Sequence, residues 1–222
     1  MRFPHDHGPH TRTKIEWWYV WGKLGSSIFF HWALFRKKNK FVLHYSLCSD
    51  GEIEYHEKRI DPENIITIDN EWIEIKSPDF RLKCLMECDP HEHKRRYYSV
   101  PHLSIHGTLK TGNKWLPIHG NGWFDHAWNE PLDKDWEWFS FKMNNGEIGM
   151  VYTRGDEQYC MIGNEKEILK EYSFIPLVNE KIFIPKHGFS YSEQPLTLYK
   201  KGTKLFVSGY GVKEKTYRYR EQ

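Results

Sequence analysis

Cysteine is scarce in this sequence, which contains only Cys48, Cys84, Cys88 and Cys160. Cys84 and Cys88 lie in a strand-like run, where four residues span roughly 13 Å, whereas a disulfide needs Cα atoms within about 7 Å. The metal-binding pattern Cys-x-x-Cys is also missing. The sequence therefore predicts four free thiols in a reducing compartment.

Long apolar runs are missing as well. No segment approaches transmembrane length, and the first six residues lack the apolar centre of a signal peptide. We therefore expect a cytoplasmic protein without a transmembrane segment. The net charge of +2 argues against a nucleic-acid partner. No glycine-rich phosphate-binding loop is present.

Helical periodicity is rare, and only residues 165–172 could form a short helix. Strand-like runs recur instead along the whole chain, separated by turn signals such as Gly25-Ser26-Ser27. This spacing is typical of an all-β barrel or sandwich. The polar turn at residues 110–114 is the best boundary between two halves, residues 1–114 and 115–222.

Aromatic residues are abundant, with 10 Trp, 13 Tyr and 13 Phe. Residues 122–141 hold four of the tryptophans and an Asp125–His126 pair among apolar rings, where both pKa values can shift strongly. Side chains alternate along a strand. We therefore expect His126 and Trp128 to share a face and Asp125 to point elsewhere.

The Asn145-Gly146 pair predicts a two-residue hairpin turn. Counting outward from it places Phe139 opposite Tyr152 and Glu137 opposite Arg154. The predicted Glu137–Arg154 pair is either a polar contact inside a pocket or a solvated strand end.

Other groupings of polar residues carry weaker functional signals. Glu16 shares a strand face with Trp18, and a buried glutamate needs a partner. Two groups of histidines, His5, His7 and His10 and also His91 and His93, could bind a metal. A metal site is the less favoured interpretation, because no further ligand follows at a sequence spacing typical of metal sites. A hydrolytic triad is weakly supported, since no Gly-x-Ser-x-Gly elbow is present.

Two motifs together are recognisable. The first combines residues 3–10, Phe-Pro-His-Asp-His-Gly-Pro-His, with residues 13–19, Thr-Lys-Ile-Glu-Trp-Trp-Tyr. The second is residues 122–128, Gly-Trp-Phe-Asp-His-Ala-Trp, followed by Trp136-Glu137-Trp138. Over most of its length the chain resembles the lipocalin-like family of the carotenoid 1,2-hydratases (hydroxyneurosporene synthases) and their relatives.

The resemblance implies two lipocalin-like β-barrel halves in tandem and a pocket for an apolar substrate. It assigns the family's His-x-Trp to His126 and Trp128, and its tyrosine to Tyr152. The presumed proton donor of the carotenoid hydratases, an aspartate, is replaced here by Arg154.

We therefore hypothesise an enzyme, a lyase (hydratase) or isomerase/cyclase, that protonates a double bond of an isoprenoid-like ligand and then adds water or closes a ring. The alternative is a non-catalytic carrier of a hydrophobic ligand. The candidate acids are Asp125, Glu16 and Glu137, in that order; no metal or cofactor is predicted. The catalytic candidates are Asp125, His126, Trp128, Tyr152 and Glu16, and the substrate-binding candidates are Trp18, Trp136, Trp138, Glu137 and Arg154.

Overall fold

The computed structural model describes residues 5–61, 65–94, 96–128, 135–154, 157–161, 172–176, 181–183, 189–200 and 208–218. Within these ranges the regular elements are strands, apart from one 3-10 turn, η1 (His5–His7), so the all-β prediction is confirmed. None of the described segments is a helix with the length and apolarity needed to cross a membrane. The possible helix at residues 165–172 lies outside the described residues, except for the first residue of a strand, Tyr172.

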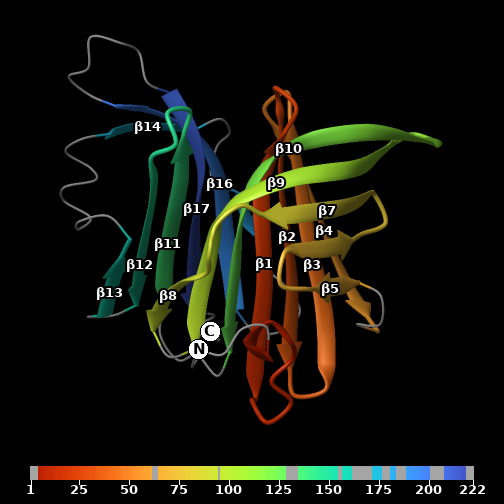
Figure 1. Ribbon diagram of the computed structural model, residues 1–222, viewed down its shortest axis with the longest axis vertical. Coiled ribbons are helices and arrows are strands. Elements are labelled where there is room, and N and C mark those ends of the chain that lie inside the picture. Colours follow the sequence, from red (N-terminus) through yellow and green to blue (C-terminus); the bar gives the residue numbers. More distant parts are fainter. Residues whose placement is uncertain are drawn as a thin grey trace. The chain divides into compact units, whose positions relative to one another are not determined.

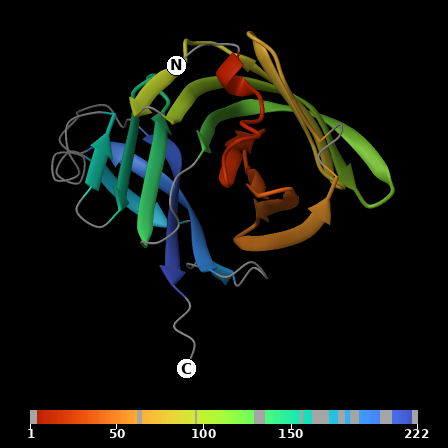
Figure 2. The same ribbon diagram turned by 90° about the horizontal axis from the view of Figure 1, so that it is seen from below.

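Ten antiparallel strands form the first sheet, in the order β4-β3-β2-β1-β10-β9-β7-β6-β5, with β8 paired to β9 (Figure 1). Their bounds are β1 Ile15–Leu24, β2 Ile28–Lys37, β3 Lys40–Ser49, β4 Glu52–Ile60, β5 Ile66–Ile68, β6 Trp72–Lys76, β7 Phe80–Met86, β8 His91–Lys94, β9 Tyr97–Thr111 and β10 Lys114–Trp128. Figure 2 shows this sheet curled into a half-barrel.

The core of the first sheet lies on its concave face. Phe30 on β2 and Phe80 on β7 are separated by three strands in the sheet order, yet their ring centroids are 5.6 Å apart. Contact between strands so distant in one sheet requires curling, so their rings must lie inside the curl. Trp32, Leu34 and Phe124 belong to the same buried cluster. The buried thiol of Cys84 is also part of it and is free, as predicted.

Seven strands form the second sheet, in the order β13-β12-β11-β17-β16-β14, with β15 paired to β16. Their bounds are β11 Trp136–Met143, β12 Ile148–Arg154, β13 Glu157–Cys160, β14 Tyr172–Pro176, β15 Lys181–Phe183, β16 Phe189–Lys200 and β17 Ser208–Arg218.

The chain divides into two compact units, residues 1–50 with 54–130, and residues 51–53 with 131–222. The predicted boundary between residues 114 and 115 instead falls inside the first unit, at the turn that joins β9 to β10. Residues Thr111 and Lys114 pair directly across this turn. A polar turn between strands and a linker between domains have the same sequence signature, which is why residues 110–114 suggested a division.

The predicted register of the β11–β12 hairpin is wrong by one residue. Met143 N donates to Glu147 O at 2.7 Å, and Gly146 N donates to Met143 O at 3.0 Å, so the loop has three residues rather than two. Gly146 has a φ of 90°, which suits the left-handed position of a three-residue loop. Trp138 consequently faces Tyr152, and Phe139 points away from it.

Candidate active site

The central pair of strands, β1 and β10, presents different chemistry on its two faces. Trp18 lies opposite His126, and Tyr19 lies opposite Asp125. Alternation along each strand therefore groups Glu16, Trp18, His126 and Trp128 on the face that carries the core, and Asp125 on the other. The predicted separation of Asp125 from His126 is confirmed.

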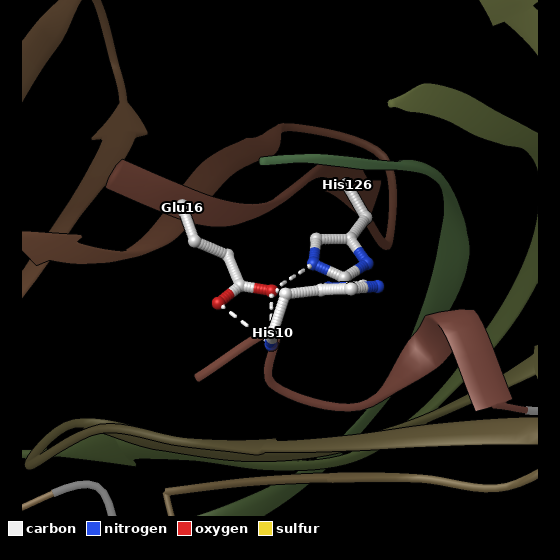
Figure 3. A group of neighbouring side chains, drawn as sticks. All are labelled: His10, Glu16 and His126. Atoms are coloured by element: carbon white, nitrogen blue, oxygen red, sulfur yellow. Dashed lines mark hydrogen bonds and ion pairs between the residues drawn. The ribbon is translucent and has the colours of Figure 1, made fainter. Parts of the chain in front are cut away.

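Glu16 is fully buried at the centre of a polar cluster on the core face (Figure 3). Its Oε1 accepts hydrogen bonds from His10 Nδ1 at 2.8 Å and from His126 Nε2 at 3.0 Å. Its Oε2 accepts from Arg36 Nη2 at 2.6 Å and from Arg36 Nε at 3.0 Å. Both oxygens of this carboxylate are therefore engaged, which meets the expectation that a buried glutamate needs partners.

The protonation state of Glu16 follows from these contacts. Burial raises its pKa, but the hydrogen bonds from His10 and His126 outweigh burial and lower the pKa to about 2. Glu16 is thus a carboxylate at neutral pH, and a carboxylate can only accept hydrogen bonds. His10 Nδ1 and His126 Nε2 must both carry hydrogens.

Aromatic rings hold the two imidazoles in place. His10 stacks on Trp128 with centroids 3.9 Å apart, and His126 stacks on Trp18 at 4.9 Å. Burial lowers the pKa of His126, even though Glu16 raises it. The Tyr98 hydroxyl lies 3.3 Å from Nδ1 of the same imidazole.

The hydrogen-bond chain continues from Tyr98 to the N-terminal segment. The Tyr98 hydroxyl lies 2.6 Å from His7 Nδ1. Burial and the neighbouring His126 lower the pKa of His7 to about 4. The Tyr98 hydroxyl thus links His7 to His126. We refer to Glu16, His10, His126, Arg36, Tyr98 and His7 as the Glu16 cluster.

Each of His10, Glu16 and His126 offers one atom that could bind a metal ion, and these three atoms lie within 4.8 Å of one another. The positive charge of Arg36 next to Glu16 disfavours a metal ion at this position. The Arg36 guanidinium already pairs with Glu16 at 2.6 Å. A divalent cation on the same buried carboxylate would face this fixed positive charge in a medium of low dielectric constant. We interpret the group as a hydrogen-bonded tie between β1, β2, β10 and the N-terminal segment.

Metal analysis tests this interpretation. Protein purified without an affinity tag is expected to contain well under one equivalent of zinc, iron or manganese by mass spectrometry. Chelation is expected to leave the melting temperature unchanged. A stoichiometric metal that His10→Ala and His126→Ala both abolish would contradict the interpretation.

Asp125 lies in a different environment on the opposite face, where it is only 3% exposed. It accepts hydrogen bonds at Oδ1 from the Ser99 hydroxyl and, at 2.9 Å, from Trp123 Nε1. Burial raises the pKa of Asp125 to about 7, although hydrogen bonds from Ser99, Trp123 and Tyr97 lower it. Two carboxyl groups on one pair of strands thus differ: Glu16 is ionised, whereas Asp125 is a weak acid near neutral pH.

The raised pKa predicts a pH dependence of stability. Between the ordinary pKa of 3.8 and about 7, folded protein binds a proton at Asp125 that the unfolded chain releases. The protonated Asp125 therefore stabilises the fold fully below about pH 4, and this stabilisation is lost as the pH rises through 7. Urea unfolding at about pH 5 and pH 8 should show native protein losing stability relative to Asp125→Asn. Parallel pH profiles for the two proteins would refute the raised pKa.

The remaining predicted site residues lie in the second unit. Trp136, Trp138, Tyr152 and Arg154 share one face of the β11–β12 hairpin, because Trp136 pairs with Arg154 and Trp138 with Tyr152. The rings of Trp136 and Tyr152 are 6.3 Å apart, and Trp138, Tyr152 and Arg154 are buried. Glu137 pairs with Thr153 and projects to the other face, so the predicted pairing of Glu137 with Arg154 is wrong.

Several residues of these groups were not predicted from the sequence. Arg36 was missed, although the Gly25-Ser26-Ser27 turn carried the signal: pairing Leu24 with Ile28 across it places Glu16 opposite Arg36. Tyr98 and Ser99 gave no motif, since they reach His126 and Asp125 from the neighbouring strand β9. His10 was considered only as a metal ligand.

Comparisons with known proteins agree with the fold. A family model described as AttH-like matches residues 85–163, which include the Gly122–Trp128 motif. A search of curated protein sequences found no match. The solved structures with similar folds include a putative AttH from Nitrosomonas europaea, with a TM-score of 0.68 and 19% identity over 97% of this chain and 96% of that one.

Two further structures are similar. Kievitone hydratase from Nectria haematococca has a TM-score of 0.63 and 12% identity, covering 98% of this chain and 93% of that one. CghA, solved with Sch210972, has a TM-score of 0.58 and 9% identity, covering 93% and 89%. At these identities the likeness establishes the fold, and the narrower resemblance to carotenoid 1,2-hydratases stays a prediction. The chain thus has the lipocalin-like fold of AttH, with sequence similarity to AttH-like proteins over residues 85–163.

Proposed function

We propose that this protein is an enzyme that protonates a double bond of an apolar, isoprenoid-like substrate and then adds water or closes a ring. The observation that carries the proposal is the state of Asp125. It is buried beside indole and hydroxyl groups, and its pKa of about 7 leaves a large share of it protonated at neutral pH. A general acid works best when its pKa lies near the operating pH.

The other two candidate acids fit this role less well. Glu16 has a pKa of about 2 and both oxygens bound, so it holds no proton to give. Glu137 lies on the hairpin face opposite to Tyr152. Asp125 therefore remains the leading candidate, and we assign Glu16, His126 and Trp128 a supporting role in holding β10 against β1.

Aromatic rings near Asp125 suit a reaction that passes through a cation. Trp21 and Trp123 stack with centroids 6.5 Å apart, and Trp123 also donates to Asp125. A desolvated aromatic face stabilises a cation by roughly 2 kcal/mol or more. For Trp18 we propose support of His126. For Trp136, Trp138 and Arg154 we retain substrate binding as a proposal, and for Tyr152 a catalytic role. One structure of similar fold is a hydratase by name, which supports the same class of reaction.

Reaction in deuterated water tests the proposal. Purified protein is incubated with a panel of prenyl and carotenoid-like alkenes, and products are examined by mass spectrometry and NMR. Protonation of a double bond by an acid that exchanges with solvent should place one deuterium on carbon in each product molecule. Binding of these compounds without conversion by the native protein would favour a carrier of hydrophobic ligands.

A further inference from the structure

His93 lies at an irregularity in strand β8 and contacts the buried Ser99. The pairing of β8 with β9 shifts register between Glu92 and Lys94, which leaves His93 at a bulge. Bulges commonly re-aim a side chain. The half-buried His93 ring packs against Tyr97 at 4.8 Å, and its Nε2 lies 2.7 Å from the Ser99 hydroxyl oxygen.

Ser99 connects His93 to Asp125. It is fully buried on β9, directly opposite Asp125 on β10. Its hydroxyl donates its single hydrogen to Asp125 Oδ1. The Ser99 oxygen must then accept from His93 Nε2–H. These three groups form a chain in which each donor points toward the buried carboxyl group.

We propose that His93 and Ser99 return a proton to Asp125 after each turnover, as proton-supply residues that act through Asp125. This inference rests on the proposed function, in which Asp125 gives its proton to the substrate. The Ser99 Oγ–H bond breaks as its proton moves to Asp125 Oδ1. A new Oγ–H bond forms with the proton that leaves Nε2 of a protonated His93. The neutral imidazole then takes up a proton from solvent.

The surroundings of Asp125 explain why such a route is needed. The carboxyl group is only 3% exposed, so bulk water does not reach it freely. Ser99, Trp123 and Tyr97 all hydrogen-bond to it. The Trp123 indole N–H has no acceptor lone pair and cannot pass a proton on, whereas Ser99 offers a hydroxyl whose oxygen also lies 2.7 Å from His93 Nε2. His93 is half-buried, and an imidazole exchanges protons with solvent near neutral pH.

A pH-jump experiment tests the route without a substrate. Protein is mixed rapidly from about pH 9 to pH 5, and the carbonyl stretch of protonated Asp125 is followed by infrared spectroscopy. The band is assigned by its loss in Asp125→Asn. His93→Gln retains a side chain that can hydrogen-bond to Ser99 but cannot relay a proton, and Ser99→Ala removes the link. Both variants are expected to slow the appearance of the band at least tenfold.

The chain offers a matched control on the same strand. Ser104 Oγ and His106 Nε2 form an exposed pair at 3.2 Å. His106→Gln and Ser104→Ala should leave the rate unchanged. If Ser99→Ala fails to fold, His93→Gln alone decides, because His93 is only half-buried.

A native rate in His93→Gln would overturn the inference, whether or not the equilibrium pKa of Asp125 moves. This outcome is distinct from failure of the proposed function. An enzyme that incorporates deuterium but shows no effect of His93→Gln would lose only the proton route. A protein that never turns over a substrate could still show the slowed band.

Discussion

Replacing Asp125 with asparagine is expected to lower turnover by about 10²–10⁴-fold, the usual contribution of general acid catalysis. The amide keeps the shape of the carboxyl group and an oxygen that accepts from Ser99 and Trp123. It loses the acidic proton and carries an NH2 group in place of the second oxygen. Turnover is measured with the substrate found in deuterated water, and binding is measured from the rise in melting temperature. Ligand at about 100 times its Kd should stabilise both proteins by roughly 2.7 kcal/mol.

A second hydrogen-bonded aspartate provides the control for this variant. Asp79 Oδ2 accepts from the Tyr45 hydroxyl at 2.7 Å. Asp79→Asn makes the same chemical change away from Asp125 and should leave turnover within about twofold of native. Full activity in Asp125→Asn would show that another group is the acid. Loss of the fold in Asp125→Asn, with Asp79→Asn intact, would make Asp125 a structural residue.

Glu16→Gln is expected to lower the free energy of unfolding by about 3–5 kcal/mol, the cost of removing one partner from a buried ion pair. Glutamine fills the same volume but leaves the Arg36 guanidinium, which is 4% exposed, without its counter-charge. It also replaces an oxygen that accepts from His10 and His126 with a group that can donate. The change is measured from urea midpoints, and the melting temperature should fall by about 10 °C.

Two further variants separate charge from general damage. Glu74→Gln breaks a half-exposed pair with Lys76, formed at 3.5 Å, and should change stability by less than about 1 kcal/mol. Adding Arg36→Met to Glu16→Gln should recover part of the loss, because the buried charge is then removed. A Glu16→Gln protein as stable as the native one would show that the Glu16–Arg36 pair contributes little.

Strand alternation was sufficient to predict the faces of β1 and β10. It places Asp125 away from His126 and puts Glu16 beside Trp18, because side chains two apart must share a face wherever a strand is regular. It could not identify Tyr98 or Ser99. Those residues reach their partners from β9, the neighbour of β10 in the sheet. Strand alternation does not predict which strands become neighbours.

The hairpin illustrates a finer limit. Asn145-Gly146 marks a turn correctly, but the same dipeptide serves two-residue and three-residue loops. The difference is a single residue, and it exchanges the two faces of a strand. Trp136 and Trp138 therefore join Tyr152, and Glu137 separates from Arg154. Likewise, the protonation states of Glu16 and Asp125 depend on partners from other strands. The sequence alone could therefore order these two residues as candidate acids but could not predict which of them holds a proton at neutral pH.

The pairing of β1 with β10 has a consequence for synthesis on the ribosome. Glu16 and His126 are 110 residues apart in the chain, and β1 lies between β2 and β10 in the sheet. At roughly 5–20 residues per second, β10 follows β1 from the ribosome after about 5–20 seconds. During this interval β1, which carries Trp17, Trp18 and Trp21, can pair with β2. The backbone N–H and C=O groups along its other edge have no strand to pair with. An unpaired strand edge promotes aggregation, so we expect the nascent chain to need protection by chaperones until β10 emerges.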